Sequence, residues 1–387
     1  MYTKEQINDL YERIAKAIDI SDELFDKAET EYLALGTWLD DETPEYKVTV
    51  YSQGSFALGT VIKPIDDSDD YDLDLVCEFA NQYGLTAESL KWDVVKPLLE
   101  RYKKTKDDIV EKRRCWHVEY EDFPGFHMDI VPAVNRDVYI DITDHDEEND
   151  RYEYIGSNPK GYIKWFDGKK AERCKAIYEK YIANKSVLKA SAEVEKIKEY
   201  QLKTPLQKAI QILKRHRDMM FAEDTTNIKP ISIIITTIAA DLYRNEDNIL
   251  DVLINFLSNA EGYIRSKMQG SEYHIDNPSY TGKDVENFAD KWNKHPERAD
   301  AFFRWLTKAK TDLIDKRIYG LFRTQLADHL RQALGVATTQ RVFTEIAKED
   351  RAAIENQSKK IVTTTGEISS SGSVSIPRNH HYGKEVF

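Results

Sequence analysis

The sequence predicts an α+β protein in which N-terminal helices precede a mixed β-sheet and a helical lobe follows it. Three observations support this prediction. Apolar residues recur with helical spacing at the start of the chain, strand-like segments cluster between residues 48 and 142, and helical patterns dominate from about Lys169 onward. A chain of 387 residues with 41% hydrophobic and 32% charged residues is typical of a globular protein with two or three lobes.

Two helices should open the chain. Thr3 and Gln6 have the spacing of a capping box, and the apolar residues that follow recur every three or four positions, which predicts an amphipathic helix. A second helix is expected from about Asp22 to Leu35.

A further helix is expected between the strands, from around Glu88 to Lys103. Near the end of the chain, residues 363–375 are polar and of low complexity, which predicts a mobile tail. In the C-terminal half, prolines mark the starts of helices and loops, namely Pro205, Pro230, Pro278 and Pro296.

The strongest functional signal is a pair of acidic residues in one strand-like segment. Asp72 and Asp74 are two positions apart, so their side chains point to the same face of a strand. Such carboxylates repel each other unless divalent cations such as Mg²⁺, which prefers oxygen ligands, bind between them. In a chain with 68 Asp and Glu residues the pair alone is weak evidence, and the acidic run at residues 66–70 is most simply a solvated loop.

A turn before the acidic pair strengthens this interpretation. The extended run at residues 48–51 meets Gln53, Gly54 and Ser55. Glycine permits a tight approach, and backbone N–H groups at a helix start can hold phosphates together with the serine hydroxyl. A Gly-Ser turn by itself is usually only a turn. Its combination with the acidic pair predicts metal-dependent nucleotidyl transfer.

A third carboxylate is expected from a neighbouring strand. Asp129 lies in an otherwise apolar run, residues 126–132, and burying an unpaired carboxylate is costly, so a metal or a basic neighbour is implied. Asp141 has a similar setting and is the main alternative. His117 and His127 lie nearby in the sequence, but a histidine on its own is more often an ordinary packed or exposed residue than a metal ligand.

These motifs together resemble the polymerase-beta-type nucleotidyltransferase superfamily, and specifically the cGAS/DncV-like nucleotidyltransferases, or CD-NTases. The motifs are Gly54-Ser55, Asp72-x-Asp74 and Asp129. A helical segment that begins near Lys203 resembles the family's helix with a triphosphate-binding lysine, and the segment from Asn277-Pro278 to residue 292 resembles one that is common in bacterial members. The resemblance covers roughly residues 5 to 335 and implies a polymerase-beta-like core.

The resemblance implies a role for each site residue. Asp72 and Asp74 would bind two Mg²⁺ ions, with Mn²⁺ as the alternative metal, and Asp129 would bind one of them and position or deprotonate the attacking ribose hydroxyl. The donor triphosphate would be held from two sides, by Gln53, Gly54 and Ser55 on one and by Lys214 and Ser232 on the other.

Two of these residues have plainer interpretations. Without the resemblance, Lys214 would be assigned to a solvated helix face, because it begins the basic run Lys214-Arg215-His216-Arg217, and Ser232 would be assigned as a helix cap. The chain also departs from several relatives, because Ile233 stands where an aromatic residue often stacks on the donor base. The base platform is therefore expected elsewhere.

The implied function is the synthesis of a cyclic di- or trinucleotide second messenger from NTPs, ATP among them, with release of pyrophosphate, in bacterial anti-phage (CBASS) signalling. The alternatives are a nucleotidyltransferase that modifies a protein, a tRNA or a small molecule, and a non-catalytic scaffold. The expected divisions are residues 1–46 for N-terminal helices that pack on both lobes, 47–200 for the catalytic core, 201–356 for the helical lobe and 357–387 for a flexible tail.

Composition and charge limit the binding partners and the cellular location that we expect. The net charge of −13 argues against strong DNA binding, although residues 160–217 hold 16 Lys and Arg against 6 acidic residues and suit nucleoside triphosphates. Three unpaired cysteines support neither a disulfide framework nor a Cys-based zinc site. Without a signal peptide or a long apolar run, the cytoplasm is expected, with no membrane partner. Regulatory protein partners, including machinery that would conjugate the tail through Gly383, follow from the resemblance.

Overall fold

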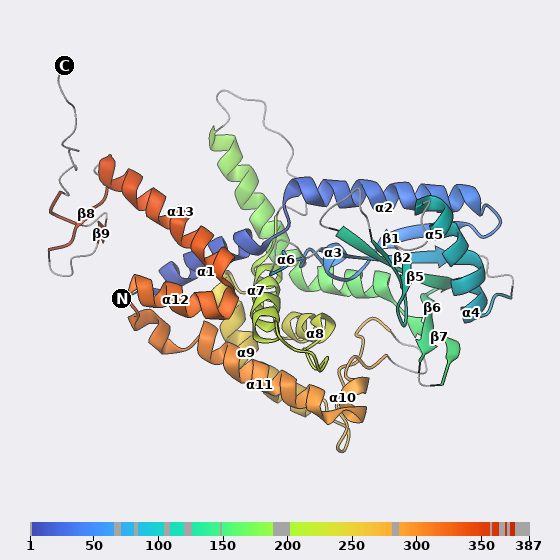
Figure 1. The fold of residues 1–387 in the computed structure, drawn as a ribbon. Helices are drawn as coiled ribbons and strands as arrows, with labels where there is room; N and C mark the ends of the chain where they lie inside the picture. Colours follow the sequence, from blue (N-terminus) through green and yellow to red (C-terminus); the bar gives the residue numbers. More distant parts are fainter. Residues whose placement is uncertain are drawn as a thin grey trace.

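In the computed structural model of this chain, a mixed β-sheet and the helices that cover it form one end of the molecule, and a helical lobe forms the other (Figure 1). The structure describes residues 2–65, 71–80, 84–103, 109–119, 126–147, 149–188, 202–280, 286–356, 358–363, 368–369 and 372–375. The acidic run at residues 66–70 and Gly383 therefore lie outside the described residues.

The two N-terminal helices belong to different parts of the molecule. Helix α1 (Lys4–Ile18) begins with the predicted capping box at Thr3 and packs in the core of the helical lobe. Helix α2 (Asp22–Glu42) packs against the sheet and extends seven residues beyond the predicted end. The prediction was wrong because Leu39 continues the buried face after Gly36, whose missing side chain lets the helix approach Val50 closely.

The sheet has seven strands in a mixed arrangement, as predicted. Its order is β1-β2-β5-β4-β3, with β6 paired to β5 and β7 to β6, and only β2 and β5 run parallel among the pairs that the structure describes. The last strand lies beyond the segment in which strands were predicted. The strands are β1 (Val48–Ser52), β2 (Tyr71–Phe79), β3 (Ile109–Glu111), β4 (Trp116–Glu119), β5 (Phe126–Arg136), β6 (Tyr139–Asp146) and β7 (Arg151–Ser157).

One face of the sheet is apolar and covered. Leu73 and Leu75 of β2 and Met128 and Ile130 of β5 pack there in a core shared with α2 and with the predicted helix between the strands. That helix is confirmed as a continuous unit, α4 (Ala87–Ser89), a π-helical segment (Leu90–Val95) and α5 (Lys96–Lys103). The opposite face of β2 and β5 carries acidic side chains beside a smaller apolar cluster that includes Val76, Val131 and Ala133.

The chain that follows the sheet is helical, as predicted, but its first helix begins ten residues before Lys169, at Pro159. Pro205 and Pro296 occupy the first positions of their helices, as expected, because proline needs no backbone donor there. The helices are α6 (Pro159–Leu188), α7 (Pro205–Met220), α8 (Ser232–Leu242), α9 (Ile249–Ser266), α10 (Asp290–Lys294), α11 (Pro296–Leu313), α12 (Arg323–Leu334) and α13 (Val336–Glu355), with a 3₁₀ turn (Lys316–Gly320) after α11.

Two features complete the described chain. A short helix, α3 (Gly54–Leu58), follows β1, and β8 (Lys360–Ile361) pairs with β9 (Ile368–Ser369) near the C-terminus. Among the described residues, no helix is both long and apolar enough to cross a bilayer.

Candidate active site

The parallel pairing of β2 with β5 brings three carboxylates to one face of the sheet. Asp74 is the register partner of Asp129, and Asp72 is the partner of His127. Because positions two residues apart share a face, Asp72 and Asp74 stand beside Asp129 on the face opposite the apolar core. The three predicted carboxylates thus share one face of two paired strands, although the ligand atoms that converge within 4.8 Å among the described residues are those of His117, His127 and Asp129.

The alternative carboxylate is excluded by strand alternation. Asp141 of β6 pairs in register with Val134, whose side chain lies in the core on the other face of the sheet. Its carboxylate accepts a hydrogen bond from the Arg136 side chain and forms an ion pair with it. Asp141 therefore lies on the wrong face to join the triad, and its charge is already balanced.

The turn before α3 is built against the second aspartate. Gly54 has a φ of +56°, and a Cβ built on it would meet the Asp74 carboxyl group, with Cγ only 3.1 Å away. The backbone N–H of Gln53 donates to the carbonyl oxygen of Asp74 at 2.8 Å. Only glycine allows both the left-handed backbone and this close approach. The start of α3, with Ser55, is thereby fixed beside the carboxylates.

The three carboxylates perturb one another. Burial, together with the negative charges of Asp72 and Asp129, raises the pKa of Asp74 to about 7. Desolvation also opposes the charge on Asp72, but the hydrogen bond with His127 and the positive charges of the groups around it together outweigh desolvation and hold the pKa of that carboxyl below its usual value. An all-oxygen group with excess negative charge fits divalent cations, which would keep every carboxylate ionised.

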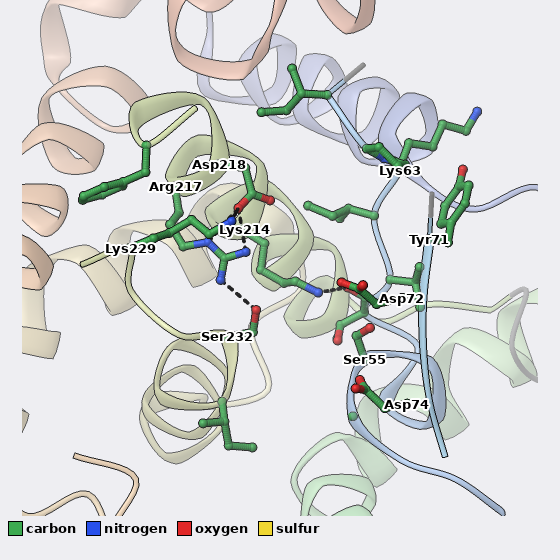
Figure 2. A pocket seen from close by; sticks show the side chains of 18 of the residues that line it. Ser55, Lys63, Tyr71, Asp72, Asp74, Lys214, Arg217, Asp218, Lys229 and Ser232 are labelled. Atoms are coloured by element: carbon green, nitrogen blue, oxygen red, sulfur yellow. Dashed lines mark hydrogen bonds and ion pairs between the residues drawn. The ribbon is translucent and has the colours of Figure 1, made fainter. Parts of the chain in front are cut away.

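A cavity of about 1040 Å³ lies between the sheet and the helical lobe, and Asp72 and Asp74, but not Asp129, are among the residues that line it. Asp72, Asp74, Gly54 and Ser55 line one side, and side chains of α7 and the start of α8 line the other (Figure 2). A cavity of this size, enclosed by two lobes, can hold a nucleotide with its phosphates.

The basic run on α7 is buried, so its interpretation as a solvated surface is wrong. Lys214 is 5% exposed and Arg217 is 6% exposed, yet both line the cavity. The Lys214 amino group donates to the carbonyl oxygen of Thr60 at 2.9 Å, and burial with the nearby Arg217 charge lowers the pKa of Lys214 to about 8. The Lys214 amino group points towards Asp72, whereas the Arg217 guanidinium is directed at Ser232 and Asp218 (Figure 2).

Ser232 is the first residue of α8 and does not cap it, since Ile231 occupies the cap position. Its hydroxyl accepts a hydrogen bond of 2.7 Å from the Arg217 guanidinium, which Asp218 also holds. Sequence reasoning assigned no individual role to Arg217. Its spacing of one turn from Lys214 was the available signal, since residues three apart share a helix face.

Two histidines adjoin the carboxylates. His117 Nδ1 lies 2.7 Å from Asp129 Oδ1, and His127 Nε2 contacts Asp72. Sequence reasoning treated both as ordinary histidines, because both contacts depend on strand pairing. His117 is the register partner of Asp129 across β4 and β5, and His127 is that of Asp72 across β5 and β2.

A second cavity, of about 200 Å³, adjoins the first. The two share Gly54, Leu58 and Ile233. Its walls are mainly apolar, with Tyr162 and Phe288 in an edge-to-face pair, and its polar groups include Asn277 and Glu286, joined by a 2.9 Å hydrogen bond from Asn277 Nδ2. Gln53 also lines this smaller cavity.

The fold and this site define a nucleotidyltransferase, in which a polar sheet face carries acidic residues beneath a phosphate-sized cavity. Comparison with known proteins agrees. Residues 1–169 match the family model of the Second Messenger Oligonucleotide or Dinucleotide Synthetase domain. The chain is 30% identical over 336 residues to a c-di-GMP synthase of Roseivirga ehrenbergii, covering 82% of each chain, and 25% identical over 297 residues to the cyclic dinucleotide synthase CdnG of Bradyrhizobium diazoefficiens, covering 74% of this chain and 69% of CdnG.

Solved structures share the fold. CdnG of B. diazoefficiens in complex with GTP has a TM-score of 0.69 at 22% identity, covering 88% of this chain and 98% of CdnG. CdnC of Escherichia coli MS115-1 with ATP has a TM-score of 0.61 at 15% identity, covering 85% and 97%. The chain belongs to the CD-NTase family of second messenger oligonucleotide or dinucleotide synthetases. Its function is the synthesis of a cyclic oligonucleotide by nucleotidyl transfer, as its resemblance predicted.

Proposed function

We propose that this protein joins guanine nucleotides into a cyclic dinucleotide, with GTP as substrate and Mg²⁺ as the metal. The observation that carries the proposal is the register that sets Asp74 beside Asp129, with Asp72 on the same face. The product named for the R. ehrenbergii relative and the GTP bound to B. diazoefficiens CdnG support guanine. ATP, expected from the sequence, is bound to CdnC and is the substrate to test against GTP.

The carboxylates provide the metal ligands in this proposal. Asp72 and Asp74 would hold two Mg²⁺ ions and Asp129 one of them, because Mg²⁺ prefers carboxylate and phosphate oxygens. Bound ions would stabilise the charge on the entering and leaving oxygens. Mn²⁺ is the alternative metal.

The remaining residues hold the reactants. Ser55 and the N–H groups at the start of α3 would bind the triphosphate from the sheet side, and Lys214, Arg217 and Ser232 from the helical lobe. Asp129 would orient the acceptor ribose hydroxyl and receive its proton. The hydroxyl oxygen then bonds to the α-phosphorus, and pyrophosphate leaves with the electron pair of the broken P–O bond. A second transfer closes the ring.

The smaller cavity would take a guanine base. Tyr162 and Phe288 offer aromatic surface, which compensates for the isoleucine at position 233. Guanine presents two adjacent N–H donors on its Watson–Crick edge, and a carboxylate can accept from both. Glu286 is the carboxylate in this cavity, and Asn277 fixes one of its oxygens.

The biological setting is inferred from relatives. We propose a role in anti-phage signalling with control by protein partners, since CdnC has been solved in a complex with a HORMA protein. Conjugation of the tail through Gly383 remains a separate proposal. Mass spectrometry of the protein expressed beside its neighbouring genes would contradict conjugation if every chain kept an unmodified C-terminus.

Incubation with all four labelled NTPs and Mg²⁺, followed by mass spectrometry of the products, tests the function. A phosphatase-resistant cyclic dinucleotide that contains guanine is expected. Asp72→Asn combined with Asp74→Asn should abolish it, whereas Asp141→Asn, which removes a carboxylate from the opposite face of the sheet, should retain it. A linear product alone, or label fixed to an added protein or tRNA, would contradict the proposal.

A further inference from the structure

Two imidazoles and a carboxylate converge at the edge of the large cavity. Strand β4 contributes His117, and the neighbouring strand β5 contributes His127 and Asp129. One ligand atom from each of the three lies within 4.8 Å of the others, and the imidazole rings are 4.3 Å apart between centroids. The side chains are 17%, 18% and 27% exposed, respectively, so an ion can reach them from solvent.

This ligand set differs from the all-carboxylate pair on β2. Mg²⁺ takes oxygen ligands and rarely accepts imidazole, whereas Mn²⁺, Co²⁺ and Zn²⁺ bind two histidines and a carboxylate well. We propose that His117, His127 and Asp129 form a transition-metal site that binds Zn²⁺ or Mn²⁺ in preference to Mg²⁺. Sheet register alone creates this site, because His117 is paired with Asp129 across β4 and β5.

A metal ion at this site would affect catalysis, because Asp129 belongs both to the site and to the carboxylate triad. An ion held by both imidazoles occupies the carboxylate that would otherwise receive the hydroxyl proton. Zn²⁺ should therefore inhibit nucleotide synthesis even in excess Mg²⁺. The competing explanation is that the histidines only orient Asp72 and Asp129 through hydrogen bonds. Direct observation of metal–nitrogen bonds separates the two.

The decisive experiment uses the wild-type chain. Electron spin-echo envelope modulation of the Mn²⁺-loaded protein should show ¹⁴N couplings from coordinated imidazole, and these should disappear in His117→Ala combined with His127→Ala. A spectrum of the wild-type protein without ¹⁴N coupling would overturn the proposal. This readout is independent of product formation, so a failure of the proposed cyclic dinucleotide synthesis would leave it unaffected.

Zn²⁺ binding provides the second measurement. In excess Mg²⁺, competition against a chromophoric chelator should give one tight site, and removal of either histidine should weaken Zn²⁺ binding by roughly 10- to 100-fold. His274→Ala is the matched control, since His274 faces Glu272 and Asp276 with different ring nitrogens, and among the described residues these three do not converge as a ligand group. Equal Zn²⁺ affinity in folded His117→Ala, His127→Ala and wild-type proteins would overturn the proposal, with folding verified by thermal unfolding.

Discussion

Gly54 and Asp74 pack so closely that a side chain on the first would overlap the carboxyl group of the second. The contact joins the phosphate-binding turn to the metal-binding strand, because the turn can approach β2 only where no Cβ intervenes. Gly54, which has no side chain, therefore fixes the position of the turn relative to the carboxylates.

Gly54→Ala should therefore damage both stability and activity. The left-handed backbone and the overlap with Asp74 should cost about 1–3 kcal/mol of the free energy of unfolding, and displacement of the carboxylate should lower kcat by ~100-fold. Chemical denaturation and steady-state kinetics measure the two effects. Gly262→Ala, inside α9 with open space around the new Cβ, is the control and should be neutral or stabilising. Wild-type activity in Gly54→Ala would contradict the positioning role.

Asp74 should make the metal-free protein less stable as the pH rises. Its pKa is raised to about 7 in the folded state, so between pH 4 and pH 7 the folded protein holds a proton that the unfolded chain has lost. The favourable contribution of Asp74 to the free energy of unfolding, which is present below pH 4, is therefore lost as the pH rises to 7. Urea denaturation in EDTA across this range should show the decline.

Asp74→Asn should remove that part of the slope and stabilise the metal-free protein at pH 8. The matched variant Asp141→Asn, on the opposite face of the sheet, should keep the Asp74-dependent slope. Identical slopes in Asp74→Asn and the wild type would show that Asp74 is not the titrating group.

Local patterns were sufficient to predict part of this site. Strand alternation places Asp72 and Asp74 on one face whatever the rest of the fold does, and the turn at Gly54 is specified by neighbouring residues. Pro205 and Pro296 correctly predicted the starts of two helices, because the effect of proline on the backbone is also local. The choice of Asp129 over Asp141, in contrast, required the pairing of β2 with β5, which neither segment encodes alone.

The failures have a common cause, which is tertiary burial. A basic run such as Lys214-Arg215-His216-Arg217 normally indicates a solvated face, but α7 is enclosed by α1, α8 and α9. Backbone carbonyls and the carboxylates of Asp218 and Asp312 are the partners of the run. His117 and Glu286 could not be assigned roles from the sequence either, because His117 meets Asp129 only through the pairing of β4 with β5, and Glu286 meets Gln53 and Tyr162 only in the folded cavity.

Lys214 should make triphosphate binding depend on pH. Its pKa is lowered to about 8 in the free protein, whereas bound phosphates favour the charged amine, so affinity for a non-hydrolysable GTP analogue should fall as the pH rises above 8. Lys214→Gln should bind about tenfold more weakly at pH 7 and lose this decline. Isothermal titration calorimetry measures both.

Lys208→Gln is the control for that experiment. Lys208 lies on the same helix but pairs with Glu12 of α1, away from the cavity lining, so its removal should leave nucleotide affinity and its pH dependence unchanged. Equal losses in both variants would indicate a general effect on α7 instead of phosphate contact.

Glu286 should determine the choice of guanine over adenine. Burial raises the pKa of its carboxyl group, and Asn277 holds it in a cavity of base size, where the paired N–H donors of guanine would restore the charged form. Glu286→Gln replaces one acceptor with a donor of the same shape, which opposes guanine and suits adenine. The ratio of kcat/KM for GTP to kcat/KM for ATP should fall by a factor that corresponds to about 1–3 kcal/mol. Glu261→Gln, an exposed residue paired with Arg265 on α9, should leave the ratio unchanged. If Glu286→Gln keeps the wild-type ratio and GTP affinity, the base is read elsewhere and the smaller cavity is not its site.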